Sequence, residues 1–168
     1  MSMAQILDAA RSLEGILVLV PDEDSGAPEI AWGDCFFYYA PDGQVPQNVQ
    51  PFATLVTKDY PDDTRSQLDA EGRYRVNIHV GRAAFQELTG EDPRSFTWSD
   101  YAAEDVVMPH PVYGALGWVS VVVPADKTMA TVLRLLQDAY DDARARADRR
   151  ASGAQGGASS GGADAPDE

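Results

Sequence analysis

Short connections between strand-like segments constrain the fold of this chain more than any other feature. Segments rich in β-branched and aromatic residues alternate with turn-forming Pro, Gly and Asp. The expected strands are 15–20, 29–32, 34–39, 52–57, 73–80 and 116–123. Parallel neighbours need a crossover of a dozen or more residues, and most of these connections are shorter. The pattern therefore predicts a mostly antiparallel sheet of about six strands.

Two amphipathic helices flank the expected strands. Ser2 and Gln5 fit a capping box at the start of the first helix, and Gly15 can end it. The last helix begins near Thr128, and a short helix is expected at 82–88. The residues expected to face the sheet from the terminal helices are Ile6, Leu13, Leu133, Leu136 and Tyr140. We therefore expect an α+β fold, a two-layer sandwich with the N- and C-terminal helices on one face of the sheet.

The end of the chain differs in composition from the rest. Residues 151–168 include 13 Gly, Ala or Ser in 18 positions and no large apolar side chain, which favours a disordered tail. A single domain is expected at 1–150. Four arginines near the expected end of the last helix are interpreted as complementing its dipole. They are Arg144, Arg146, Arg149 and Arg150.

The charge of the chain excludes some functions. Its 27 acidic and 13 basic residues give a net charge of −14, opposite to the field of a nucleic-acid binder. No apolar run is long enough for a membrane helix, and the N-terminus does not have the pattern of a secretory signal. Cys35 is the single cysteine, which excludes an intramolecular disulfide and a cysteine-based zinc site. We expect a soluble cytoplasmic protein, a monomer or homodimer, with no nucleic-acid or membrane partner.

Four long segments resemble a known family. They are PEIAWGDCFFYYAPDG (28–43), PFATLVTKDYP (51–61), YRVNIHVGRAAFQEL (74–88) and MPHPVYGALGWVSVVVP (108–124). Together they resemble a bacterial, mostly actinobacterial, domain-of-unknown-function family, number 6194, over roughly residues 3–145. That family has no established activity, so the resemblance implies no site residue. A more distant similarity is to the MmcQ/YjbR-like proteins of CyaY-like fold, in which His110 and Trp118 would occupy comparable places.

His110 is the first candidate for chemistry. It lies between Pro109 and Pro111, which fix the backbone around a group that titrates near neutral pH. Asp59, after the strand at 52–57, is a candidate carboxylate partner for general acid/base catalysis if the two residues meet. The alternatives are that His110 hydrogen-bonds a loop carbonyl and that Asp59 is an ordinary turn residue.

One face of the strand at 73–80 is a candidate anion site. A small anionic ligand could contact Arg75, Asn77, His79 and Arg82, because a helix start follows the strand and no acidic residue interrupts this stretch. The alternative is a solvated sheet face whose arginines pair with carboxylates, since polar-out alternation is typical of any half-buried strand.

The irregular segment 91–115 is the longest connection of the domain. Long connections in compact domains are commonly binding or lid loops, and this one carries aromatic side chains that need cover. We expect a pocket between this segment and the sheet. Its expected walls are His110, Tyr113 and Trp98, facing Lys58, Asp59 or the 75–79 face. The alternative is that the segment only completes a small core.

Three classes of function remain open from the residues. The first is a module that binds a small molecule or a protein without catalysis, which we favour. The second is a small enzyme that uses His110 with a carboxylate, and the third is nucleic-acid binding. Two histidines without metal-ligand spacing predict no metal site, and no cofactor motif is present.

Overall fold

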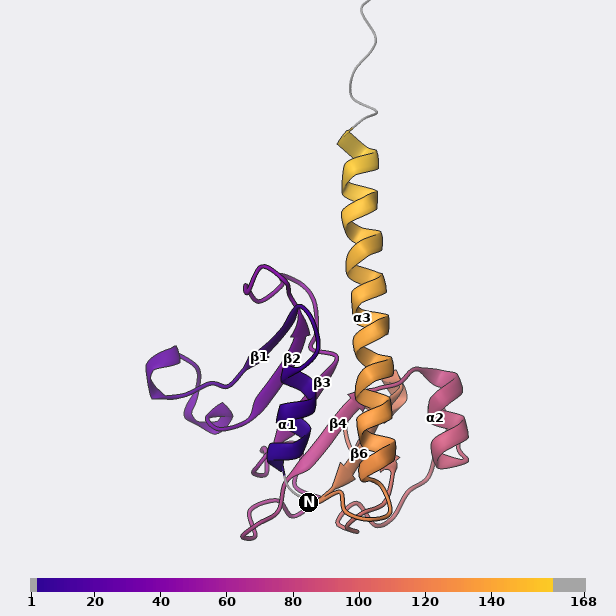
Figure 1. Ribbon diagram of the computed structural model, residues 1–168. Coiled ribbons are helices and arrows are strands. Elements are labelled where there is room, and N and C mark those ends of the chain that lie inside the picture. Colours follow the sequence, from indigo (N-terminus) through magenta and orange to yellow (C-terminus); the bar gives the residue numbers. More distant parts are fainter. Residues whose placement is uncertain (1–2, 159–168) are drawn as a thin grey trace, which may run out of the picture.

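The computed structural model describes the backbone of residues 3–158 and the side chains of residues 3–153. Its helices are α1 (Met3–Arg11), α2 (Arg82–Thr89) and α3 (Met129–Ala158), and its strands are β1 (Ile16–Leu19), β2 (Cys35–Tyr39), β3 (Ala53–Val56), β4 (Arg75–His79), β5 (Met108–Pro109) and β6 (Trp118–Val122). Three short 3-10 helices lie between them, η1 (Glu23–Ser25), η2 (Glu29–Ala31) and η3 (Gly114–Leu116). Figure 1 shows these elements along the chain.

The six described strands form one sheet in the order β1-β2-β3-β4-β6-β5. Every neighbouring pair is antiparallel, which confirms the predicted fold class. The expected strand at 29–32 is wrong, because this segment forms η2. Pro28 begins the turn, and the amides of Ala31 and Trp32 bond to carbonyls three residues before them. Only four residues separate Pro28 from Gly33, so hydrogen bonds within the segment replace strand pairing.

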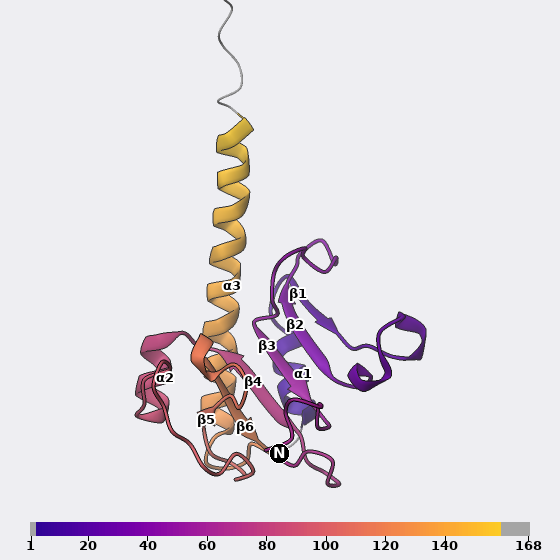
Figure 2. The same cartoon turned by 180° about the vertical axis from the view of Figure 1, so that it is seen from behind.

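Both terminal helices pack on the same face of the sheet, as predicted. Figure 1 shows α1 and α3 in front of the strands, and from behind the strands lie in front of both helices (Figure 2). Alternate residues of the central strands, such as Phe37, Leu55 and Val76, meet the apolar faces of the helices. The five residues expected at this interface all belong to this core or pack against it, although Leu13 lies just beyond the end of α1. We call this side the helix face.

A second, smaller core lies on the other side of the sheet. Val56, Val122 and Met108 of the sheet pack there with Leu68 and Tyr101, which come from the two long connections. The segment 91–115 therefore folds back over the sheet, as expected. We call this side of the sheet the open face, because no described helix covers it (Figure 2).

Helix α3 is longer than the sequence indicates. Its described span ends at Ala158, so the expected domain boundary at residue 150 falls inside the helix, and residues 159–168 lie outside the described chain. The interpretation of the four arginines as dipole-complementing side chains is wrong for the same reason, since Arg150 lies two turns before that end. None of the described helices is long and apolar enough to cross a membrane.

Candidate functional site

A polar row crosses the open face at the centre of the sheet. In the strand register, Phe36 of β2 lies opposite Thr54 of β3, Thr54 opposite Asn77 of β4, and Asn77 opposite Ser120 of β6. The amide of Asn77 donates to Thr54 Oγ1 at 3.0 Å, and its Oδ1 accepts from Ser120 Oγ at 2.7 Å. Asn77 and Ser120 are buried. These contacts satisfy polar groups that water cannot reach and fix the orientation of the Asn77 side chain.

Arg75 and Asp63 form a largely buried ion pair beside this row, two residues along β4 from Asn77. The Arg75 guanidinium contacts both Asp63 oxygens, at 3.0 and 2.5 Å, and also donates to Ser66 and to Asn77 Oδ1. The Arg75 side chain is 1% exposed. Four of its five N–H groups therefore have partners among the described residues, so most of its hydrogen-bonding capacity serves the fold.

The charge of Asp63 is stabilised by this pairing. Burial by itself would raise the pKa of the Asp63 carboxyl, but the hydrogen bonds and positive charge of Arg75 outweigh burial and lower it. Asp63 therefore remains ionised and cannot act as a proton donor near neutral pH.

His110 is held by the turn that follows it. Its Nδ1 accepts hydrogen bonds from the backbone amides of Val112 and Tyr113, each at 3.0 Å. A nitrogen that accepts carries no proton, so the neutral ring has its proton on Nε2. Among residues 3–153 no group hydrogen-bonds to Nε2, which leaves an N–H donor beside the cavity described below. The expected bond to a loop carbonyl is replaced by these two amide bonds.

The turn after His110 depends on two glycines. Gly117 has φ +83°, and a Cβ there would lie 3.0 Å from Gly81 Cα. At Gly114 a Cβ would lie 2.7 Å from the Phe96 ring. Both positions therefore exclude a larger side chain, and the tight turn holds His110 against the sheet.

The buried site keeps His110 uncharged. Burial, followed by the positive charge of Arg75, lowers the pKa of the imidazole from 6.5 to about 3, against an opposing effect of Asp63. Protonation of Nδ1 would also break both amide bonds. His110 is therefore a hydrogen-bond donor of fixed orientation and a weak base.

A cavity of about 660 Å³ lies on the open face, and we call it the sheet-face cavity. The floor is the polar side of β3 and β4, and the turn at 110–116 and the loop at 28–31 form two walls. The lining residues are Pro28, Ile30, Ala31, Phe36, Tyr38, Gln50, Pro51, Thr54, Val56, Tyr60, Asp62, Asp63, Arg75, Asn77, His110, Val112, Tyr113, Leu116 and Trp118. The volume is that of a typical small-molecule site.

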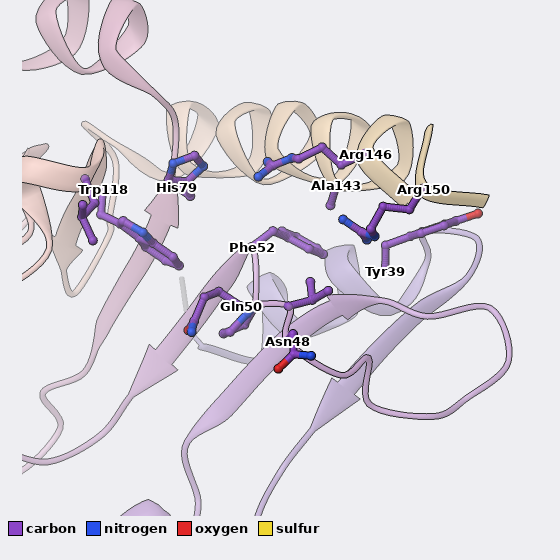
Figure 3. A pocket seen from close by; sticks show the side chains of 12 residues that line it. Tyr39, Asn48, Gln50, Phe52, His79, Trp118, Ala143, Arg146 and Arg150 are labelled. Carbon is purple, nitrogen blue, oxygen red and sulfur yellow. The ribbon is translucent and has the colours of Figure 1, made fainter. Parts of the chain in front are cut away.

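A second, smaller hollow of about 350 Å³ lies at the end of the sheet under α3, and we call it the α3 cleft (Figure 3). Its lining residues are Tyr39, Asn48, Val49, Gln50, Pro51, Phe52, His79, Leu116, Trp118, Ala143, Arg146 and Arg150. Burial and then the charge of Arg146 lower the pKa of His79, while the Leu116 backbone and Asp142 oppose them. The His79 ring lies 5.7 Å from that of Trp118.

The structure brings together only part of the expected site. His110, Tyr113, Arg75 and Asn77 line the sheet-face cavity, whereas His79 lines the α3 cleft. The remaining candidates, Arg82, Trp98, Lys58 and Asp59, line neither cavity.

Arg82 is exposed and pairs with Asp92 at 3.0 Å, so it does not join the other candidates for an anion site. Trp98 donates to the Asp100 carbonyl and packs against the second core, and neither cavity has it in its lining.

Lys58 and Asp59 are engaged in the connection after β3. Lys58 Nζ contacts Asp34 at 3.2 Å and the Trp32 carbonyl at 2.6 Å. Asp59 Oδ1 accepts from the Leu68 amide at 2.8 Å, and no hydrogen bond or ion pair in the described chain joins Asp59 to His110. The described geometry thus provides no His110–Asp59 dyad.

Sequence reasoning overlooked several residues of the open face. Asp63 and Ser66 lie in a polar connection that has no recognisable motif, so their partnership with Arg75 has no local signal. Thr54 and Ser120, in contrast, do have a local sequence signal. Each is a polar residue within an otherwise apolar strand, which indicates a polar partner across the sheet.

No metal centre is formed by the described residues, because no three His, Cys, Asp or Glu side chains within this part of the chain are grouped so as to hold an ion. The polar groups of the sheet-face cavity are instead suited to hydrogen bonds with an organic molecule.

Comparison with known proteins gives one match. Neither the curated proteins nor the solved structures produced a similar chain, so the more distant similarity to MmcQ/YjbR-like proteins has no support. The profile of a family of unknown function matches residues 1–152, most of the chain. The chain therefore belongs to DUF6194.

Proposed function

We propose that this protein is a binding module that holds a small organic molecule in the sheet-face cavity without transforming it. The observation that carries the proposal is the cavity itself, about 660 Å³ above the buried polar row of the sheet. Protein interiors are close-packed, and an open space of this size is typical of a ligand site.

The lining supports an organic ligand. Its walls are largely apolar and include Phe36, Tyr38 and Trp118, on which a flat or aliphatic body can pack. The floor and the adjoining wall supply hydrogen-bond donors, among them the Thr54 hydroxyl and the His110 Nε2–H. Such a floor fits a ligand that presents oxygen acceptors to the sheet.

The two other classes of function have less support. General acid/base catalysis needs a group that exchanges protons near neutral pH, whereas the pKa of His110 is lowered to about 3 and Asp63 is held ionised by Arg75. Binding of nucleic acid is disfavoured by the net charge of −14.

The proposal is tested by filling the cavity. Phenylnaphthylamine is an uncharged dye that fluoresces when it enters an apolar site, and it should bind the wild type saturably. Thr54→Tyr places a ring over the floor and should weaken binding at least about tenfold. Thr97→Tyr changes an exposed threonine outside both cavities and should not alter it. Equal affinity in all three proteins would contradict the proposal.

A second experiment separates binding from folding at His110. Asn keeps an oxygen near the position of Nδ1 and loses the Nε2–H donor, whereas Gln keeps a donor near Nε2 and loses the acceptor. In a thermal-shift screen of metabolites, compounds that stabilise the wild type should stabilise His110→Asn less. Without ligand, His110→Gln should have a lower melting temperature than the wild type. It should retain more of the ligand-induced increase in melting temperature than His110→Asn.

A further inference from the structure

The α3 cleft has an unusual charge for this chain. Acidic residues outnumber basic ones 27 to 13 overall, yet the twelve residues that line the cleft include Arg146, Arg150 and His79 and no Asp or Glu. A hollow lined by cations within an acidic protein attracts anions locally.

The two arginines face the cleft because of their spacing. Ala143, Arg146 and Arg150 lie three and four residues apart, so they share one face of α3, and the small Ala143 leaves room above Phe52. In Figure 3, Arg146 extends along the helix toward His79, and Arg150 lies at the other end near Tyr39.

Within residues 3–153, no carboxylate forms an ion pair with either arginine. The ion pairs among the described side chains involve Lys58, Arg73, Arg75 and Arg82. Arg146 donates only to the backbone carbonyl of Asp142, at 3.3 Å, a bond that leaves the rest of its guanidinium available. Two cations with free donors are therefore in place for an anionic group.

The cleft also adjoins the sheet-face cavity. Gln50, Pro51, Leu116 and Trp118 line both, so the two spaces share a wall. Leu116 is 67% exposed, an unusual position for a large apolar side chain, and it lies at this shared wall. One molecule can pack its body against Trp118 and Leu116 and direct a charged group toward α3.

We infer that the ligand of this protein is an organic anion, with its apolar body in the sheet-face cavity and its carboxylate, sulfonate or phosphate group in the α3 cleft, where Arg146 and Arg150 supply the positive charge. The inference rests on the proposed function and adds the chemical class of the ligand. The polar floor contributes donors, and the arginines contribute the selectivity for charge.

Two matched dyes test this inference. Anilinonaphthalene sulfonate has the same aromatic body as phenylnaphthylamine and adds one sulfonate. In the full-length protein, Arg146→Gln/Arg150→Gln should weaken the sulfonate dye about tenfold and leave the neutral dye within about twofold, because charge-assisted hydrogen bonds are lost only for the anion.

The control removes the same charge elsewhere on α3. Arg134→Gln/Arg149→Gln alters two exposed arginines that line neither cavity, so it should change the affinity of either dye by less than about twofold. An equal loss in both double variants would show a general charge effect and overturn the inference. Melting temperatures measured beside the titrations verify that the variants are folded.

The outcomes distinguish the inference from the proposed function. Suppose that Thr54→Tyr lowers the affinity for the neutral dye, but Arg146→Gln/Arg150→Gln binds both dyes like the wild type. The cavity is then a ligand site, and the inferred anion site is wrong. Suppose instead that only the sulfonate dye binds, and that its affinity depends on the two arginines but not on Thr54. The anion site is then supported, and the cavity proposal is wrong. Absence of saturable binding for both dyes overturns both.

Discussion

The two faces of the sheet are buried by different physical means. Along β4, Val76 and Ile78 enter the apolar core of the helix face, while Arg75 and Asn77 point to the open face, and none of the four is more than 1% exposed. The helix face excludes water with apolar contacts, which have no required direction. Along β4 the open face does so with hydrogen bonds and one ion pair, each of which needs a particular partner, while the smaller apolar core around Val56 and Val122 covers another part of that face.

This difference suggests that the two faces have different roles. An apolar core that is closely packed leaves no room for a ligand. A polar face must orient its groups, and where the covering loops leave it uncovered, the oriented groups line a cavity. On this view the helix face provides stability and the open face provides recognition.

The largest effect is expected on the helix face. Phe37 is completely buried, with its ring 6.3 Å from that of Phe52, so Phe37→Ala should lower the free energy of unfolding by about 4 kcal/mol. Urea denaturation measures this. Phe37→Leu, which keeps most of the volume, should cost well under half as much. Similar losses for both substitutions would show that the face is not closely packed.

On the open face, the largest effect is expected at the buried ion pair. Asp63→Asn leaves the Arg75 charge without its partner and should cost about 3 kcal/mol. Asp63→Asn/Arg75→Met removes both charges, so its loss should be smaller than the sum of the single losses by at least about 1.5 kcal/mol. Additive losses in urea denaturation would mean that the pair is not coupled.

The response to pH should identify His110. The unfolded chain protonates this ring with a pKa of 6.5, whereas the folded protein does so only at about 3. Between pH 7 and pH 5 the unfolded state therefore binds more protons, and the free energy of unfolding falls as the pH falls, by about 2 kcal/mol from this residue.

The contribution of His110 is isolated by comparing the pH dependence of the free energy of unfolding in the wild type and in His110→Asn. His79, whose pKa is also lowered, and the carboxylates are common to the wild type and His110→Asn, so subtraction of the two pH profiles leaves the effect of His110. Parallel profiles from pH 7 to pH 5 would show that the ring is not held neutral.

The smallest effect is expected within the polar row. Thr54→Val removes the acceptor of the Asn77 amide at the cavity floor and should cost about 1 kcal/mol. Thr97→Val, at an exposed position, should stay within about 0.5 kcal/mol of the wild type. An unchanged midpoint for Thr54→Val would indicate that water replaces the lost partner.

Much of the fold could be predicted because its signals are local. Most connection lengths favour an antiparallel sheet, and the helical spacing of Ile6 or Leu136 identifies the buried helix surface. Where local signals conflict, prediction failed. The segment 29–32 has strand-forming residues but is too short between Pro28 and Gly33, and there the turn prevails.

The site was less predictable because its contacts join distant segments. Alternation in 73–80 indicates which side chains share a face but does not show that Arg75 and Asn77 are buried, since burial depends on Asp63 and Ser66 in another connection. The rigid segment around His110 was visible in the sequence. Its hydrogen bonds and its cavity depend on the turn that follows and on the sheet behind it.

If the open face recognises a ligand, the three tryptophan indoles will respond to that ligand differently in one spectrum. Trp118 lines the sheet-face cavity, whereas Trp98 and Trp32 line neither cavity and donate their indole N–H groups to nearby carbonyls. In a ¹H–¹⁵N correlation spectrum titrated with phenylnaphthylamine, we expect a saturable shift of the Trp118 indole signal and no shift of the Trp98 and Trp32 signals. A stationary Trp118 signal, or equal shifts of all three, would contradict it.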